Sequence, residues 1–233
     1  MTQIQIAAVA SFGVAVTVGA YVLSLLARKR YPSPLTTPVL FSTTIVIAVL
    51  LGSGISFADY GPAKQIMTFL LGPATVALAL PLYKNRQVFF RNMVPAGCGL
   101  LAGSLGTMVV AGLTARLLGF APSLTSSIAI KSTTVPIAVE IAKIIQAAPA
   151  LTAIFVVITG MMGASLGPWL MTRIGIIHPV SRGLALGAIS HGQGTAEAIV
   201  ESQLSGAVAG VSMGLAAVCT SLAAPYIVPL LAG

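Results

Sequence analysis

The sequence predicts an all-α, polytopic transmembrane helical bundle. Of its 233 residues, 57% are hydrophobic and 7% are charged, whereas soluble domains average about 45–50% apolar and about 25% charged residues. Apolar runs of roughly 20 residues recur along the chain, and each is long enough to cross about 30 Å of hydrocarbon. Basic residues gather at the ends of these runs, as in cytoplasmic loops. We therefore treat residues 1–233 as a single transmembrane domain.

Six apolar runs are predicted to be full spans. The first is followed by Arg28–Arg30 and lacks the basic start of a signal peptide, so we expect a retained span there. Residues 1–90 form the N-terminal, scaffold-like spans, and residues 91–233 carry the polar features. The predicted spans are Ile4–Ala27, Leu35–Leu51, Ile66–Leu82, Val94–Leu118, Leu151–Met171 and Ser205–Leu230.

Two further apolar stretches, Ser123–Ile145 and Gly183–Val200, are interrupted by glycine, proline, hydroxyl and charged residues. Stretches of this kind in a membrane protein are typical of broken or re-entrant segments, which we predict as two hairpins.

The positions of the basic loops predict the direction of each span. With the N-terminus outside, the basic loops lie on the cytoplasmic side if the first interrupted stretch enters and leaves from the outer side, with Arg116 and Lys64 as exceptions. The span Val94–Leu118 and its hairpin then match the oppositely directed span Leu151–Met171 and its hairpin. The sequence thus predicts an inverted repeat within residues 91–233, an architecture found in many secondary transporters.

The first polar group is the stretch Lys131–Pro136. Pro136 favours the first turn of a helix, and Thr133 or Thr134 is a candidate cap before it. A half-helix that begins inside the membrane presents free N–H groups and a partial positive charge, to which Lys131 adds a full charge. This arrangement predicts an anion site. The alternative is that Lys131 extends to an interface and the threonines satisfy backbone groups.

The second polar group surrounds His191. Gly192 and Gly194 let the backbone unwind, and Thr195 can cap the helix that follows. Glu197 then lies in the first turn, where negative charge is favoured. His191 titrates near neutral pH and can carry a proton or donate to a carboxylate. The alternatives are a hydrogen-bonded structural histidine and a glutamate that only complements the helix dipole.

The stretch Leu71–Thr75 is a third candidate break, because Pro73 can open a helix at Gly72. We favour a structural kink over ligand contact there.

The remaining composition excludes several classes of function. The chain has four acidic residues and two isolated cysteines without metal-ligand spacing. We therefore expect no catalytic residues, metal or cofactor, and hence no enzyme. The net charge of +8 is scattered along the chain rather than massed on one face, so we expect no nucleic-acid binding.

Taken together, several motifs resemble the LrgB/CidB family of bacterial inner-membrane proteins, and the resemblance spans most of the chain. The motifs are Leu71–Ala79, Pro81–Tyr83, Lys131–Ala138, Leu151–Ala153, Thr159-Gly160 and His191–Ala196. Gln193 and Thr133 depart from the family pattern, which bears on substrate choice. The resemblance implies a multi-pass protein of the bacterial inner membrane. It also implies one of two functions: antiholin-like control of murein hydrolase export and lysis with a small LrgA/CidA-type partner, or transport of small carboxylates.

We hypothesise a transporter of small monocarboxylates of the pyruvate, glycolate, glycerate or lactate type that works by alternating access. His191, Glu197 and Glu140 are the candidates for a coupled proton. The antiholin-like regulator remains the alternative. Glycine-rich helix faces also predict a homodimer. The predicted substrate-binding residues are Lys131, Ser132, Thr133, Thr134, His191, Gly192, Gly194 and Thr195.

Overall fold

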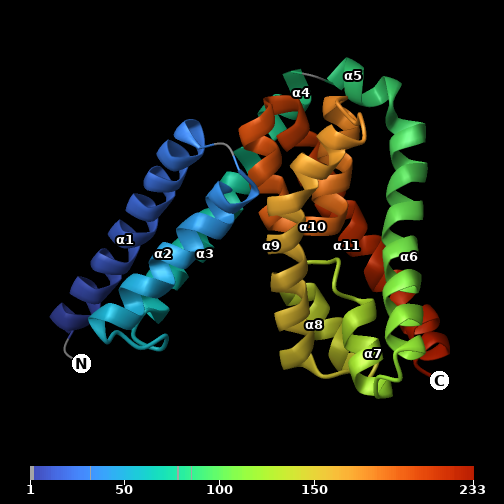
Figure 1. The fold of residues 1–233 in the computed structure, drawn as a ribbon, viewed down its shortest axis with the longest axis horizontal. Helices are drawn as coiled ribbons and strands as arrows, with labels where there is room; N and C mark the ends of the chain where they lie inside the picture. The colour runs from blue at the N-terminus through green and yellow to red at the C-terminus, as the bar shows by residue number, and fades with distance from the viewer. Residues whose placement is uncertain (1–2, 32, 78, 85) are drawn as a thin grey trace. The chain divides into compact units, whose positions relative to one another are not determined.

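The structure, a computed structural model, describes residues 3–31, 33–77, 79–84 and 86–233, and its regular secondary structure over these residues is helical. The chain divides into two compact units, Met1–Ala79 and Leu80–Gly233. The helices of the first unit are α1 (Gln3–Arg30), the 3₁₀ turn η1 (Pro34–Thr36), α2 (Pro38–Ser53) and α3 (Gly61–Ala77). Figure 1 shows them in blue and cyan.

In the first unit, α1 packs against both α2 and α3. Gly13 of α1 permits the close approach to α3, because a Cβ atom at this position would lie 2.7 Å from the Ala63 Cβ. The Thr17 hydroxyl lies 2.7 Å from the Tyr60 hydroxyl and joins the same two segments through a hydrogen bond. A glycine that permits close approach and one hydrogen bond therefore bring α1 against the start of α3, although the two lie far apart in the sequence.

The third candidate break, Leu71–Thr75, does not interrupt the helix. The helix α3 continues through Pro73 and ends at Ala77. A proline inside a helix removes one backbone hydrogen bond and adds a kink, which neighbouring groups in membrane helices accommodate.

Four of the six predicted spans coincide with helices that are long and apolar enough to cross a membrane, among the residues that the structure describes. These are Ala7–Arg30, Met93–Leu117, Pro149–Arg173 and Gln203–Ala232. The other two runs fall on α2 and α3, which have 16 and 17 residues. The protein is thus a multi-pass helical membrane protein, in which α2 and α3 are shorter than the four long apolar helices.

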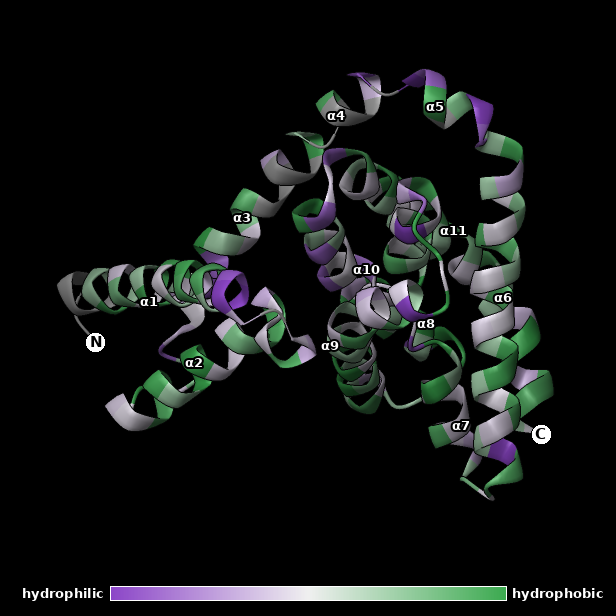
Figure 2. Ribbon diagram, turned by 45° about the horizontal axis from the view of Figure 1, so that its top comes forward, coloured by the Kyte–Doolittle hydropathy of each residue, from purple (hydrophilic) through white to green (hydrophobic). Residues whose placement is uncertain are grey.

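The second unit begins with short helices, and it continues with long helices between which α7 and α8 are short. Figure 2 shows hydrophilic residues on α5 and mainly hydrophobic or neutral residues along α6. The elements are α4 (Ala79–Lys84), α5 (Arg86–Arg91), α6 (Met93–Leu117), α7 (Pro122–Ala129), α8 (Val135–Ile144), α9 (Pro149–Arg173), α10 (Pro179–Glu201) and α11 (Gln203–Ala232).

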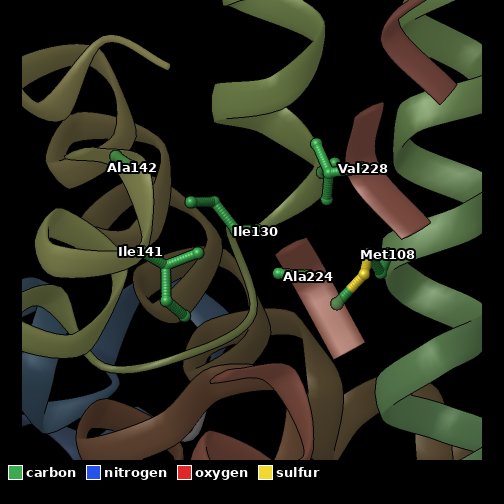
Figure 3. Packing of buried hydrophobic residues seen from close by; sticks show 7 residues of the cluster. Met108, Ile130, Ile141, Ala142, Ala224 and Val228 are labelled. Atoms are coloured by element: carbon green, nitrogen blue, oxygen red, sulfur yellow. The ribbon is translucent and has the colours of Figure 1, made fainter. Parts of the chain in front are cut away.

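A buried apolar cluster lies where α6, α8 and α11 meet (Figure 3). Met108 of α6 and Val228 of α11 lie beside Ile130, which follows α7 directly, and Ile141 of α8 belongs to the same cluster. Ile130 is fully buried. The first residue of the interruption between α7 and α8 is therefore anchored in the core of this unit.

The helix α10 folds back on itself. His191 has φ 41° and ψ −127°, which interrupts the helix. A Cβ atom on Gly194 would lie 2.1 Å from the Leu186 carbonyl oxygen, although eight residues of straight helix span about 12 Å. Gly183 and Gly187 meet the carbonyls of Ser205 and Ala209, so the first arm runs parallel to α11. The chain must then return along the second arm.

The first interrupted stretch likewise forms two short helices. The helices α7 and α8 have 8 and 10 residues, and therefore span only about 12 Å and 15 Å. The Ala148 N–H donates to the Ser127 hydroxyl at 3.2 Å, which ties α7 to the start of α9. Figure 1 shows α7 and α8 at the end of this unit near the C-terminus. Both predicted interruptions are present.

Candidate functional site

The first break runs from Ile130 to Thr134, between α7 and α8. Thr134 is the N-cap of α8 and has an extended backbone, but its hydroxyl makes no capping hydrogen bond. Pro136 lies in the first turn, as the sequence predicts. The first N–H groups of α8 therefore face the break without a side-chain cap, which leaves them available to an acceptor.

The side chains of the break differ in their surroundings. The Lys131 ammonium is half-buried and donates to the Ser132 hydroxyl at 3.2 Å. Ser132 and Thr133 are buried, with 7% and 2% of their surface exposed. Within the described part of the chain, the Thr133 hydroxyl has no hydrogen-bond partner. Because a buried hydroxyl without a partner is costly, Thr133 is suited to contact a polar ligand.

The second break is centred on His191. A positive φ in a residue other than glycine costs about 1–3 kcal/mol and recurs at functional sites. The His191 ring is buried, and its Nε2 lies 3.0 Å from the Val156 carbonyl oxygen of α9. A carbonyl oxygen only accepts hydrogen bonds, so Nε2 carries a proton and the neutral ring has its basic lone pair on Nδ1. His191 is thus held by α9 while its Nδ1 can accept a proton.

Two glycines of α9 make this approach possible, and sequence reasoning gave them no role at the site. A Cβ atom on Gly160 would lie 2.6 Å from His191 Cε1 and 2.3 Å from Gln193 Oε1. A Cβ atom on Gly163 would lie 1.8 Å from the Ser190 hydroxyl oxygen. The signals in the sequence are the Thr159-Gly160 motif and a pair of glycines three residues apart in an apolar span.

The helix after the second break starts earlier than predicted. Its helical residues follow His191 directly, so Thr195 is no cap and lies inside the arm, where its hydroxyl donates to the His191 carbonyl at 2.9 Å. Glu197 lies beyond the first turn and is buried, with 1% of its surface exposed. Gly192 is exposed, whereas Gly194 is buried against Leu186. The unusual backbone of His191 itself makes the turn that the glycines were expected to make.

Glu140 lies apart from both breaks. It is on the exposed side of α8, with its carboxylate 2.7 Å from the Lys143 ammonium and 67% of its side chain exposed. The two hairpins that carry the breaks, by contrast, pack against the same three helices. The helices α6, α9 and α11 each pack against at least one of α7 and α8 and also against α10. The hydrogen bonds of the described residues do not join Lys131 directly to His191.

A polar clamp closes the base of the α10 hairpin. Arg182 in the first arm donates to both carboxylate oxygens of Glu201 at the end of the second arm, with Nε 2.9 Å from Oε2. It also donates to the Pro168 and Ile176 carbonyls and to the Thr172 hydroxyl. All five N–H donors of a guanidinium are thereby used. Sequence reasoning missed this clamp because its partners are 19 residues apart.

The fold and the two breaks define a class of protein: a polytopic membrane protein with paired interrupted segments. The LrgB-like family matches residues 17–230. The chain belongs to this family, as the motifs of its two breaks predict.

Individual relatives support the same assignment over nearly the whole chain. It is 36% identical to YxaC of Bacillus subtilis (strain 168) over 224 residues, which cover 96% of this chain and 97% of that protein. It is 34% identical to YwbG of the same organism, over 85% of this chain and 88% of that protein. It is 29% identical to the holin-like protein CidB of Staphylococcus aureus (strain N315), over 92% of this chain and 93% of that protein. No solved structure matches.

Proposed function

We propose that this protein carries small monocarboxylates, of the pyruvate, glycolate, glycerate or lactate type, across the inner membrane of a bacterium. The observation that carries the proposal is the pair of helix interruptions, between α7 and α8 and at His191. Each has polar side chains, and each is followed by a helix whose N-terminus lies at the interruption. Helix N-termini that point into a bundle favour anions. A pore that only lyses cells needs neither feature.

The proposed architecture is an inverted repeat within a protein of six crossings. One unit is the long helix α6 followed by the hairpin α7–α8, and the other is α9 followed by the two arms of α10. In this arrangement both hairpins are re-entrant and enter from opposite sides, and α2 and α3 complete the crossings. Movement of the hairpins relative to the other spans then gives alternating access.

The proposed substrate site combines the two breaks. Lys131 supplies the positive charge, and the hydroxyls of Ser132, Thr133 and Thr134 supply hydrogen bonds to the carboxylate. The buried Thr133 hydroxyl and its vacant hydrogen-bonding capacity support this role. From the second break, His191, Gly192 and Thr195 face the substrate. Gly194 is explained by its packing against Leu186 without any ligand.

His191 is the best candidate for a coupled proton. Because Nε2 donates to the Val156 carbonyl in both the neutral and the charged ring, Nδ1 can gain and lose a proton without breaking that contact. Glu197, buried in the same arm, is the second candidate. Glu140 is the weakest of the three because its carboxylate is exposed and already paired with Lys143.

The test is uptake of labelled pyruvate, lactate and glycolate into proteoliposomes. We expect saturable uptake that falls at least about tenfold in Lys131→Ala, since a charge-assisted hydrogen bond contributes about 1.5–3 kcal/mol. His191→Ala should abolish the dependence of uptake on a pH gradient. Lys143→Ala is the matched control, because Lys143 belongs to the same hairpin but is exposed. Absence of saturable uptake, or equal uptake in Lys131→Ala and the control, contradicts the proposal.

A second function is favoured by the printed name of the CidB relatives, which are called holin-like proteins. In this alternative the chain regulates murein hydrolase export and lysis with a small LrgA/CidA-type membrane partner. Deletion of the gene then alters autolysis, and variants without carboxylate uptake, such as Lys131→Ala, restore normal lysis as well as the wild type does. The transport proposal predicts that such variants do not complement.

A further inference from the structure

A pocket of about 360 Å³ lies between the first break and α6. Lys131 forms one side of it, and the other side is a face of α6 composed mainly of small residues. The α6 residues in this wall include Ala102, Gly103, Gly106, Thr107 and Ala111.

The glycines of this wall are not needed for helix packing. A Cβ atom on Gly103 or Gly106 would meet no atom within 4 Å, so the space beside each glycine is open. Gly112 on the same helix is different, because a Cβ atom there would lie 2.7 Å from the Leu231 side chain. Packing therefore explains Gly112, whereas Gly103 and Gly106 widen the pocket.

The charge of the pocket comes from Lys131. Lys131 is the sole charged side chain among the described residues that line it, and the Thr107 hydroxyl donates to the Ser104 carbonyl at 3.0 Å. One ammonium can neutralise one carboxylate. A second carboxylate would find no counter-charge among the described residues that line the pocket, whose other groups are mainly apolar, and this disfavours it.

We propose that this pocket holds the transported acid, with its carboxylate at Lys131 and its carbon chain against Gly103 and Gly106. The face of α6 is then a size filter that admits short monocarboxylates and excludes dicarboxylates and bulky side chains. This inference rests on the proposed transport function and deepens it by assigning α6, which lies outside both breaks, to substrate selection.

The test introduces a larger side chain that affects only the pocket. Gly106→Leu adds bulk where the protein has no neighbouring atom, and Gly214→Leu is the matched control on α11, where a Cβ atom also meets nothing within 4 Å. We expect Gly106→Leu to lower pyruvate uptake into proteoliposomes at least about tenfold, as surplus methylenes in an apolar pocket do. Gly214→Leu should change pyruvate uptake by no more than about twofold, because substitutions at open positions away from a binding site have small effects. Gly106→Ala should lower pyruvate uptake less than Gly106→Leu does, and it should lose inhibition by a branched 2-oxo acid.

Competition experiments on the wild type test the charge argument. Unlabelled lactate should inhibit pyruvate uptake, and malonate at the same concentration should not. If Gly106→Leu takes up pyruvate at the wild-type rate and with the wild-type size preference, the pocket assignment is wrong. The proposed transport function is unaffected by that result. An equal loss in Gly106→Leu and Gly214→Leu, or inhibition by malonate as strong as by lactate, also overturns the pocket assignment. Absence of pyruvate uptake by the wild type refutes the proposed function itself.

Discussion

Substitution of the two glycines that follow His191 separates packing from ligand contact within one motif. A Cβ atom on Gly194 would lie 2.1 Å from the Leu186 carbonyl oxygen and 2.6 Å from the Ser190 Cβ. Both neighbours belong to the opposite arm of the hairpin or its turn, and the closer one is backbone. Gly194→Ala therefore forces the two arms apart, and overpacking of this kind costs about 1–3 kcal/mol, or more where backbone must move.

Gly192 provides the matched control. It is exposed, its φ is not positive, and a Cβ atom there would meet nothing within 4 Å. Gly192→Ala should leave stability unchanged or raise it by up to about 1 kcal/mol, because alanine favours the helix over glycine. For chains of this size about 1 kcal/mol corresponds to roughly 2–4 °C in melting temperature, so Gly194→Ala should melt about 2–12 °C below the wild type.

The measurement is thermal unfolding of the purified variants in the same detergent. Its readout is the fraction of protein that remains monodisperse after heating. The prediction is an order: Gly192→Ala at or above the wild type, and Gly194→Ala clearly below it. A Gly194→Ala protein as stable as the wild type would show that the arms of α10 do not fold back at this point.

Further predictions concern the contacts that hold the α10 hairpin. Arg182→Gln should lower the free energy of unfolding by about 2–4 kcal/mol. Breaking a buried ion pair costs about 3–5 kcal/mol, and the partial exposure of Arg182 and Glu201 reduces that cost. Lys143→Gln, at an exposed position, should change the free energy of unfolding by less than about 1 kcal/mol. Similar melting of the two variants in parallel heating experiments refutes the clamp. Gly163→Ala should destabilise the protein by about 1–3 kcal/mol, and Ser190→Ala in the same chain should recover part of that loss. A double-mutant cycle measures this coupling, and strictly additive effects contradict the contact between α9 and the hairpin.

Local sequence signals predicted the first break better than the second. Pro136 lies in the first turn of α8 with Thr134 as the N-cap, as expected from proline and threonine preferences. His191 makes the second break although two glycines follow it, and its ring is held by the Val156 carbonyl and packs over Gly160, more than 30 residues away in the sequence. Contacts over such separations are set by tertiary packing, which local propensity does not report.

The polar residues at the ends of the second hairpin illustrate the same limit. From the sequence, Arg182 is one of several basic residues near a span end, and Glu201 follows Glu197 by one helical turn. The hairpin brings Arg182 and Glu201 together as a pair with 12% and 15% of their side chains exposed. The predicted hairpin Gly183–Val200 implies that its two ends lie close together, but the sequence does not specify which side chains pair at those ends.

Counterflow in proteoliposomes tests the central claim most directly. Vesicles that contain the purified protein are loaded with unlabelled pyruvate and diluted into a trace of labelled pyruvate. A carrier with one alternating site predicts a transient accumulation of label above its equilibrium level, and loss of that accumulation in Lys131→Ala. A monotonic approach to equilibrium, unaffected by the internal pyruvate, would contradict the account and indicate an open pore.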